Sequence, residues 1–268
     1  MIRINADTQW QELQAIAAKS EDGFGAFPRE SKYGSAPGLV PYGEAYADTL
    51  VAPADYKEVI HHCHAQKIFP MYHQANTWMP KGSKWNQNGL PYCWAWGMTA
   101  AVMDCQAVEG KRDATTELLA PVSLGHCVGW KKKGNYLESA IKGVVERGIA
   151  PASFIPDPHS RSYKDYLPGW EDAALLNRIP ADSVWDTDPD NMLQHAVSIL
   201  RTGRSLYIAY NWWGHALSCV GLLWDESEPN NVVWVIRNSH NEDDFILLTG
   251  RKGVPSEAFG IHATLNAA

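Results

Sequence analysis

The chain has 268 residues, of which 45% are hydrophobic and 20% are charged, and this composition argues against a disordered chain or a coiled coil. Its net charge is −7 and its pI is near 5.8. A phosphate-binding groove needs clustered positive charge, and the only dense basic run is Lys131 to Lys133, so we expect no nucleic-acid partner.

The first residues, Met1 to Ser20, lack the basic and then apolar stretches of a secretory signal. No later stretch approaches the roughly 18 uninterrupted apolar residues of a membrane-spanning helix. The five cysteines are few and odd in number, so we expect at least one free thiol and a reducing compartment. We predict a soluble protein, cytoplasmic or otherwise without a signal peptide, that does not bind a membrane.

Apolar residues at helical spacing predict a first helix over residues 7–18 and a second over residues 55–69. Between them, residues 23–43 are rich in Gly, Pro, Ser and Tyr and have no apolar period, which indicates an extended arm lying over a surface. Glycine, lysine and proline mark residues 80–91 as a loop.

Residues 93–108 are apolar almost all round, rich in alanine and free of proline, which is typical of a helix buried inside a domain. Two more helices are predicted over residues 136–147 and about 189–202. The apolar period then changes to about two, which predicts strands at residues 205–210, 215–223, 232–237 and 245–248. Helices followed by an antiparallel sheet predict an α+β fold with a cleft between the halves.

Cys93 stands in the first turn of the buried helix. A helix N-terminus lowers the pKa of a thiol, and the thiolate is the nucleophilic form, although a buried core cysteine is the alternative. The segment from Asn86 to Trp96, with Gln87 six positions before Cys93 and Trp94 after it, resembles the active-site segment of papain-like cysteine peptidases. The resemblance implies that Cys93 is the nucleophile and that Gln87 donates to the oxyanion.

Two later segments are similar to the same family. His215 begins the run His-Ala-Leu-Ser-Cys-Val-Gly, and Asn238 ends the run Val-Trp-Val-Ile-Arg-Asn. In papain-like peptidases the histidine of the first strand is the base, and the asparagine after the second orients it. The separations from Cys93, 122 and 145 positions, are close to the roughly 130 to 150 typical of this arrangement.

The chain departs from the family pattern at two places. Leu90, Pro91 and Tyr92 stand where the family has Cys-Gly-Ser, and His240 stands where it has the tryptophan that shields the His–Asn hydrogen bond. The aromatic residues that could replace that shield are Trp212, Trp213 and Trp234.

The segment Gly134-Asn135-Tyr136 resembles the family's glycine-rich substrate ledge. We therefore expect Trp94, Gly134, Asn135 and Trp213 to contact substrate. The resemblance implies a papain-like fold, with a helical left subdomain around a buried central helix, an antiparallel β-barrel-like right subdomain, and the active site between them. Residues 53–268 are expected to form this catalytic domain, and residues 1–52 an N-terminal arm or pro-segment-like extension.

The predicted function is hydrolysis of peptide bonds in a peptide or protein substrate through a Cys-His-Asn triad and an acyl-enzyme, without a cofactor. A thiol amidase or transpeptidase with the same triad is one alternative, and a papain-like scaffold with a structural or binding role is another. The first 50 residues could also inhibit the enzyme by lying in the cleft.

One cluster suggests metal chemistry. His61, His62, Cys63 and His64 are consecutive, but on a helix only His61 and His64 share a face, so we expect a solvated surface and no metal. Cys105 and Cys219 lie within apolar segments and are expected to be packing residues.

Overall fold

The computed structural model describes residues 2–5, 7–8, 25–77, 86–87, 90–129, 134–160, 162–228, 230–239 and 245–265. Almost all of the helix predicted over residues 7–18 therefore lies outside the described residues. No helix in the described ranges is long and apolar enough to cross a membrane.

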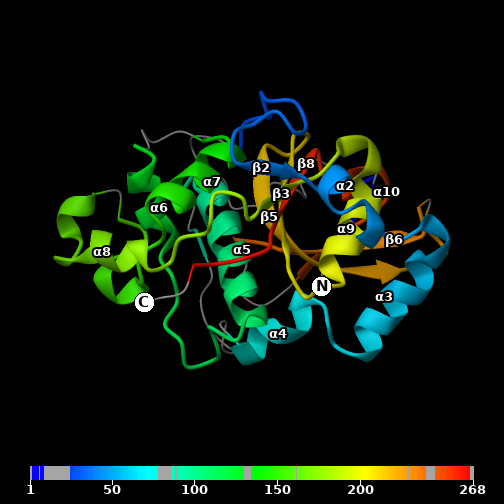
Figure 1. Ribbon diagram of the computed structural model, residues 1–268, viewed down its shortest axis with the longest axis horizontal. Helices are drawn as coiled ribbons and strands as arrows, with labels where there is room; N and C mark the ends of the chain where they lie inside the picture. The colour runs from blue at the N-terminus through cyan, green and yellow to red at the C-terminus, as the bar shows by residue number, and fades with distance from the viewer. Residues whose placement is uncertain are drawn as a thin grey trace.

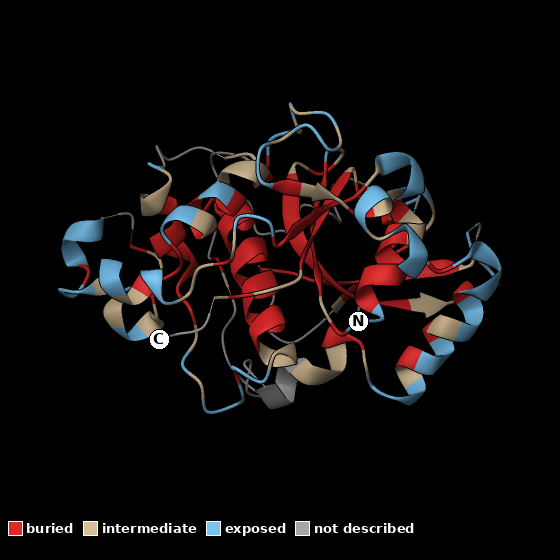
Figure 2. Cartoon of the chain, viewed as in Figure 1, coloured by how far each residue is buried: buried red, intermediate tan, exposed pale blue. Residues whose placement is uncertain are grey.

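The central element is α5, Cys93–Val108, which is buried along nearly its whole length (Figure 2). Its small side chains let neighbouring elements approach closely from several sides. A Cβ added at Gly97 would lie 3.0 Å from the carbonyl oxygen of Leu217, so the helix rests almost directly on strand β5, His215–Trp224. On its other side α5 packs against α6, Pro121–Cys127, and α7, Leu137–Glu146 (Figure 1).

One eight-stranded sheet lies on the opposite side of α5 from α6 and α7, in the order β1-β7-β6-β5-β4-β8-β3-β2. The neighbours from β7 through β3 are antiparallel, and the two edge strands β1 and β2 are parallel to their neighbours. The strands other than β5 are β1 Ile2–Ile4, β2 Leu39–Pro41, β3 Val184–Asp186, β4 Leu206–Tyr210, β6 Val232–Arg237, β7 Phe245–Leu248 and β8 Glu257–Ile261.

The two faces of the sheet contribute to different buried clusters because side chains alternate along each strand. Ala209, Ala216 and Phe259 belong to the cluster around α5 that includes Cys93. The residues on the opposite face belong to a second cluster with α3, Tyr56–Ala65, and α9, Met192–Leu200. The remaining helices are α2 Tyr42–Ala45, α4 Pro70–Thr77, α8 Trp170–Leu175 and α10 Gly250–Gly253.

The predicted α+β architecture is confirmed, with a helical part around α5 and a mainly antiparallel sheet beside it (Figure 1). The predicted helix at residues 55–69 ends earlier, at Ala65, and α4 follows it as a separate helix. Residues before position 53 are part of the sheet, since β1 pairs with β7 and β2 pairs with β3.

Candidate active site

Cys93 is the first residue of α5, at the point where this helix meets the start of β5. Burial raises the pKa of its thiol to about 12. The backbone N–H groups of Ala216, Trp94 and Cys93 itself oppose this rise, because each donates toward the sulfur. The contact with Ala216 places the sulfur beside the residue that follows His215. None of the five cysteines is in a disulfide bond.

The strand ends bring His215 and Asn238 together. His215 begins β5, Asn238 follows β6, and the two strands are antiparallel neighbours, with Ser218 opposite Arg237. The His215 Nε2 lies 3.2 Å from the Asn238 Oδ1. If Nε2 carries the proton, it donates to the amide oxygen and leaves Nδ1 as the basic nitrogen.

Gln87 is held next to this pair by Ser239. Its backbone N–H donates to the Ser239 carbonyl at 2.7 Å, and the Ser239 hydroxyl donates to the Gln87 Oε1. The Gln87 Nε2 donates to the carbonyl of Leu90, and an amide nitrogen has a second N–H. The loop before α5 and the loop after β6 are therefore tied together at Gln87.

A buried ion pair fixes the last residue of β6 against α5. The Arg237 guanidinium donates to both carboxylate oxygens of Asp104, at 3.1 Å each. Both side chains are almost completely buried. Asn238 follows Arg237 directly, so this ion pair sets the position of the Asn238 backbone relative to the helix that begins at Cys93.

Trp213 contacts the candidate base. Its ring meets the His215 imidazole edge-on, with centroids 4.9 Å apart, and it is itself buried and stacked on Trp212. Of the three tryptophans that could replace the family's shielding tryptophan, Trp213 is the one that stands against His215. Trp94 is also fully buried, and its indole N–H donates to the Pro91 carbonyl.

Residues 25–29, which we call the strap, cross the predicted substrate ledge. The Asn135 N–H donates to the Gly25 carbonyl at 2.7 Å, and the Phe27 N–H donates to the Asn135 carbonyl at 3.1 Å. The Ala26 N–H donates to the carbonyl of Gly214, the residue before His215, at 2.9 Å. The strap therefore forms hydrogen bonds with the backbone of Asn135 on the predicted substrate ledge and with the backbone of Gly214 next to the candidate base.

Glycines make this close approach possible. A Cβ on Gly134 would lie 2.3 Å from the Gly25 carbonyl oxygen, and a Cβ on Gly25 would lie 2.5 Å from the Pro91 carbonyl oxygen. Gly25 also has φ +90°, which disfavours any residue with a side chain. Of the predicted substrate contacts, Gly134 and Asn135 thus meet the strap directly.

Arg29 anchors the end of the strap. Its guanidinium donates to both carboxylate oxygens of Asp186, at 2.6 and 2.7 Å, and its Nε is 3.1 Å from Glu138. It also lies over the ring of Phe259, 5.3 Å from the centroid. No local sequence pattern marks this anchor, since Arg29 and Asp186 are 157 positions apart and neither lies in a recognisable motif.

His64, from the histidine-rich stretch of α3, has a structural environment. Its two ring nitrogens face the Tyr72 hydroxyl and the Leu222 carbonyl. No group of three His, Cys, Asp or Glu that could hold a metal ion occurs among the residues that the structure describes.

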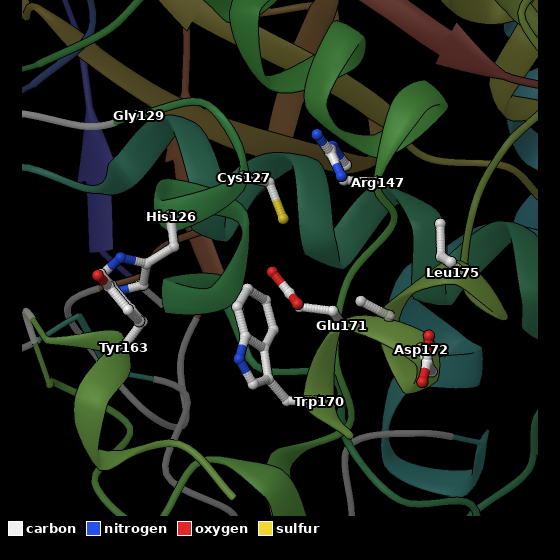
Figure 3. A pocket seen from close by; sticks show the side chains of 10 residues that line it. His126, Cys127, Gly129, Arg147, Tyr163, Trp170, Glu171, Asp172 and Leu175 are labelled. Atoms are coloured by element: carbon white, nitrogen blue, oxygen red, sulfur yellow. The ribbon is translucent and has the colours of Figure 1, made fainter. Parts of the chain in front are cut away.

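A separate pocket of about 580 Å³ lies between α6 and α8. Figure 3 shows His126 beside Tyr163 on one side and Arg147 on the other, with Cys127, Trp170 and Glu171 between them. None of the candidate catalytic residues lines this pocket.

Comparison with known proteins shows the fold. No protein-family model matches the sequence, and no curated protein matches it. Many solved structures match in three dimensions, and those described below are cysteine proteases or their proforms. The fold is papain-like.

The digestive procathepsin L2 of Tenebrio molitor aligns with a TM-score of 0.59 and 16% identity, over 98% of this chain and 84% of that chain. Xylellain from Xylella fastidiosa has a TM-score of 0.57 and 14% identity, over 93% of this chain and 98% of its own. The procathepsin L 3 of T. molitor has a TM-score of 0.51 and 15% identity, over 66% of this chain and 65% of that chain. The TM-scores show the papain-like fold, and the low identities show that this chain is divergent in sequence.

Proposed function

We propose that the protein is a cysteine peptidase in which Cys93 attacks the carbonyl of a peptide bond. The main observation that supports this proposal is the hydrogen bond between His215 and Asn238. Cys93 lies next to this pair at a helix N-terminus, and its sulfur accepts a hydrogen bond from the Ala216 N–H. The papain-like fold and the known activity of the similar solved structures support the assignment.

The chemistry follows from the groups present. His215 takes the Cys93 proton, and the sulfur then bonds to the substrate carbonyl carbon. The Cys93 N–H and the Gln87 side-chain amide donate to the oxygen that becomes negative. His215 returns the proton to the amine as the C–N bond breaks, which leaves a thioester. Water, deprotonated by His215, then cleaves the thioester and releases the acid.

The strap acts as a built-in inhibitor in this proposal. It bonds to Asn135 on the predicted substrate ledge and to Gly214, the residue before the candidate base, and the Cys93 thiol is buried. In this proposal the strap must leave these backbone groups before a substrate can bind there and reach Cys93. Two of the similar solved structures are procathepsins, the precursor form of such proteases.

The test is digestion of a complex peptide mixture by the strap-weakened variant Gly25→Ala, with and without Cys93→Ala, and the products are identified by mass. The matched control is Cys105→Ala, which removes another buried thiol from the same helix. Hydrolysis that is lost in Cys93→Ala and retained in Cys105→Ala supports the proposal. Hydrolysis that survives in Cys93→Ala contradicts it.

The complete burial of Cys93 favours one second candidate, a scaffold in which the strap never leaves and no catalysis occurs. The two functions differ in the behaviour of a protein with a weakened strap. A peptidase gains Cys93 reactivity when the strap loosens, whereas a scaffold with a decayed site gains none.

A further inference from the structure

The pocket between α6 and α8 lies in the helical part of the molecule, with α8 at the end farthest from the sheet (Figure 1). Its volume of about 580 Å³ falls within the roughly 300–1,000 Å³ of small-molecule sites in proteins. None of the described residues that line it takes part in the proposed peptide hydrolysis. A ligand bound there would give the chain a second function, separate from the candidate active site.

Charged groups of both signs line this pocket. Arg147 follows α7, and Glu171 and Asp172 lie in the first turn of α8. Burial raises the pKa of the nearby Cys127 thiol to about 11, the charge of Arg147 lowers it and the charge of Glu171 raises it, so both charges lie close to this sulfur. Within the described part of the chain, neither side chain forms an ion pair or a hydrogen bond. Both charges are therefore available to a ligand.

A close backbone contact fixes the separation of these charges. A Cβ added at Gly148 would collide with the Ala174 carbonyl oxygen, so the chain that follows Arg147 touches α8 directly. Gly148 also has φ +75°, a conformation that favours glycine. Because Arg147 and Glu171 belong to two segments that meet here, a ligand would find them already in place.

Aromatic rings form the other side of the pocket. Four of them contact one another edge to face in the order Tyr163, His126, Tyr166 and Trp170, with centroids 5.7, 5.1 and 5.2 Å apart. The His126 Nε2 and the Tyr166 hydroxyl are buried and have no hydrogen-bond partner among the residues that the structure describes. A buried polar atom without a partner often marks a place where a ligand or water completes the structure.

The segment that carries α8 also exposes apolar surface. Five large hydrophobic side chains are exposed in the described ranges, and four of them lie in this segment: Tyr163, Leu167, Leu175 and Leu176. Figure 3 shows two of these four, Tyr163 and Leu175, on opposite sides of the pocket. Apolar side chains that gather around one pocket, instead of being scattered singly, are typical of a binding site.

We propose that this pocket binds a free aromatic α-amino acid as its zwitterion. The ligand carboxylate pairs with the Arg147 guanidinium, its ammonium pairs with Glu171, and its ring packs against Trp170 and Tyr163. Figure 3 shows Arg147 and the Tyr163 ring on opposite sides, with Glu171 and Trp170 between them, which suits a molecule with two charges at one end and a ring at the other. A simple anion or cation would meet a like charge in the same pocket without a compensating group.

The inference does not depend on the proposed peptidase function, so its first test measures binding alone. The full-length protein is titrated by calorimetry with L-tryptophan and with three analogues. N-acetyl-L-tryptophan lacks the ammonium, L-tryptophanamide lacks the carboxylate, and L-alanine lacks the ring. We expect one L-tryptophan per chain and an affinity about tenfold or more lower for each analogue. Equal affinities for all four compounds, or no saturable binding of L-tryptophan at millimolar concentration, would overturn the inference.

Two variants assign each charge of the ligand to its partner. Arg147→Gln should weaken binding of L-tryptophan by about tenfold and leave binding of L-tryptophanamide unchanged, because the amide has no carboxylate to lose. Glu171→Gln should weaken L-tryptophan to a similar extent and leave N-acetyl-L-tryptophan unchanged. The matched control is Glu146→Gln, an exposed residue next to Arg147 that does not line the pocket, and it should bind as the wild type does. Wild-type affinity for L-tryptophan in both Arg147→Gln and Glu171→Gln would place the ligand elsewhere and contradict the inference.

Discussion

The ring of Trp213 meets the imidazole of His215 edge-on, with centroids 4.9 Å apart, two positions before the histidine in the chain. In papain-like peptidases a tryptophan after the Asn-Ser pair shields the His–Asn hydrogen bond, and this chain has His240 there. Trp213 packs against the imidazole from a position before the histidine in the sequence, whereas the family's tryptophan comes after the asparagine. A ring packed against the imidazole restricts its rotation, so Trp213 stabilises the orientation of His215.

Replacement of Trp213 should weaken catalysis through this orientation. We expect Trp213→Leu to lower kcat/KM by about tenfold, which corresponds to about 1.4 kcal/mol in the barrier. Trp212→Leu is the control, because Trp212 stacks on Trp213 and has no ring contact with His215 among the described residues. The pH dependence of kcat/KM should shift on its acidic side in Trp213→Leu and stay unchanged in Trp212→Leu. Equal effects of the two variants would assign Trp213 a packing role.

The Asp104–Arg237 ion pair should behave as a buried pair that is costly to break. Arg237→Met leaves the Asp104 carboxylate buried without its cation, and we expect a loss of about 3–5 kcal/mol in the free energy of unfolding. The double variant Asp104→Leu with Arg237→Met should recover most of this loss. Urea denaturation measures both. Additive losses in the double variant would contradict a coupled pair.

Glu257 should make stability depend on pH. Its folded pKa, about 8, is above its ordinary value of 4.5, so its stabilising contribution is complete below about pH 4.5 and is lost as pH rises through 8. Between pH 5 and pH 9 the wild-type protein should lose stability relative to Glu257→Gln, on the order of a few kcal/mol. Thermal or urea unfolding at several pH values measures the difference. A constant difference would show that Glu257 is ionised in the folded protein.

Gly25→Ala should loosen the strap without altering the catalytic groups. The new Cβ would lie 2.5 Å from the Pro91 carbonyl oxygen, at a residue with φ +90°. We expect the rate of Cys93 alkylation by a small thiol reagent to rise by about tenfold or more, since unfavourable contacts of about 1–3 kcal/mol populate the open form.

Gly129→Ala is its matched control, because that position has a similar φ of +66° and nothing within 4 Å of the added Cβ. It should leave the alkylation rate unchanged. An unchanged rate in Gly25→Ala as well would mean that the strap does not limit access to Cys93.

The sequence predicted α5 to the residue because its buried faces leave an unmistakable composition, alanine-rich and apolar on every side. The strands from β4 to β7 were also recognisable by their period of two. Strand β8 was missed, since Glu257 and Gly260 interrupt its apolar alternation. The environment of these two residues depends on contacts with distant parts of the chain, which a local sequence pattern does not reveal.

Only the part of the candidate site that lies in local sequence motifs could be predicted. Local motifs identify the four candidate catalytic residues from the sequence alone: Gln87, Cys93, His215 and Asn238. Arg29 and Glu257 have no local motif, because their partners lie on distant strands and become neighbours only in the fold. The strap was predicted as part of an extended arm that could lie in the cleft, but no local pattern identifies Asn135 and Gly214 as the residues to which it bonds.

We propose that Cys93 is an activated nucleophile and that the strap limits access to it. It is tested most directly by exposing Gly25→Ala to a thiol-directed peptide epoxide and mapping every adduct by mass. We expect one adduct, on Cys93, which forms faster than in the wild-type protein and is absent when His215→Ala is added. No adduct on Cys93, or labelling that spreads over Cys63 and other thiols regardless of His215, would contradict it.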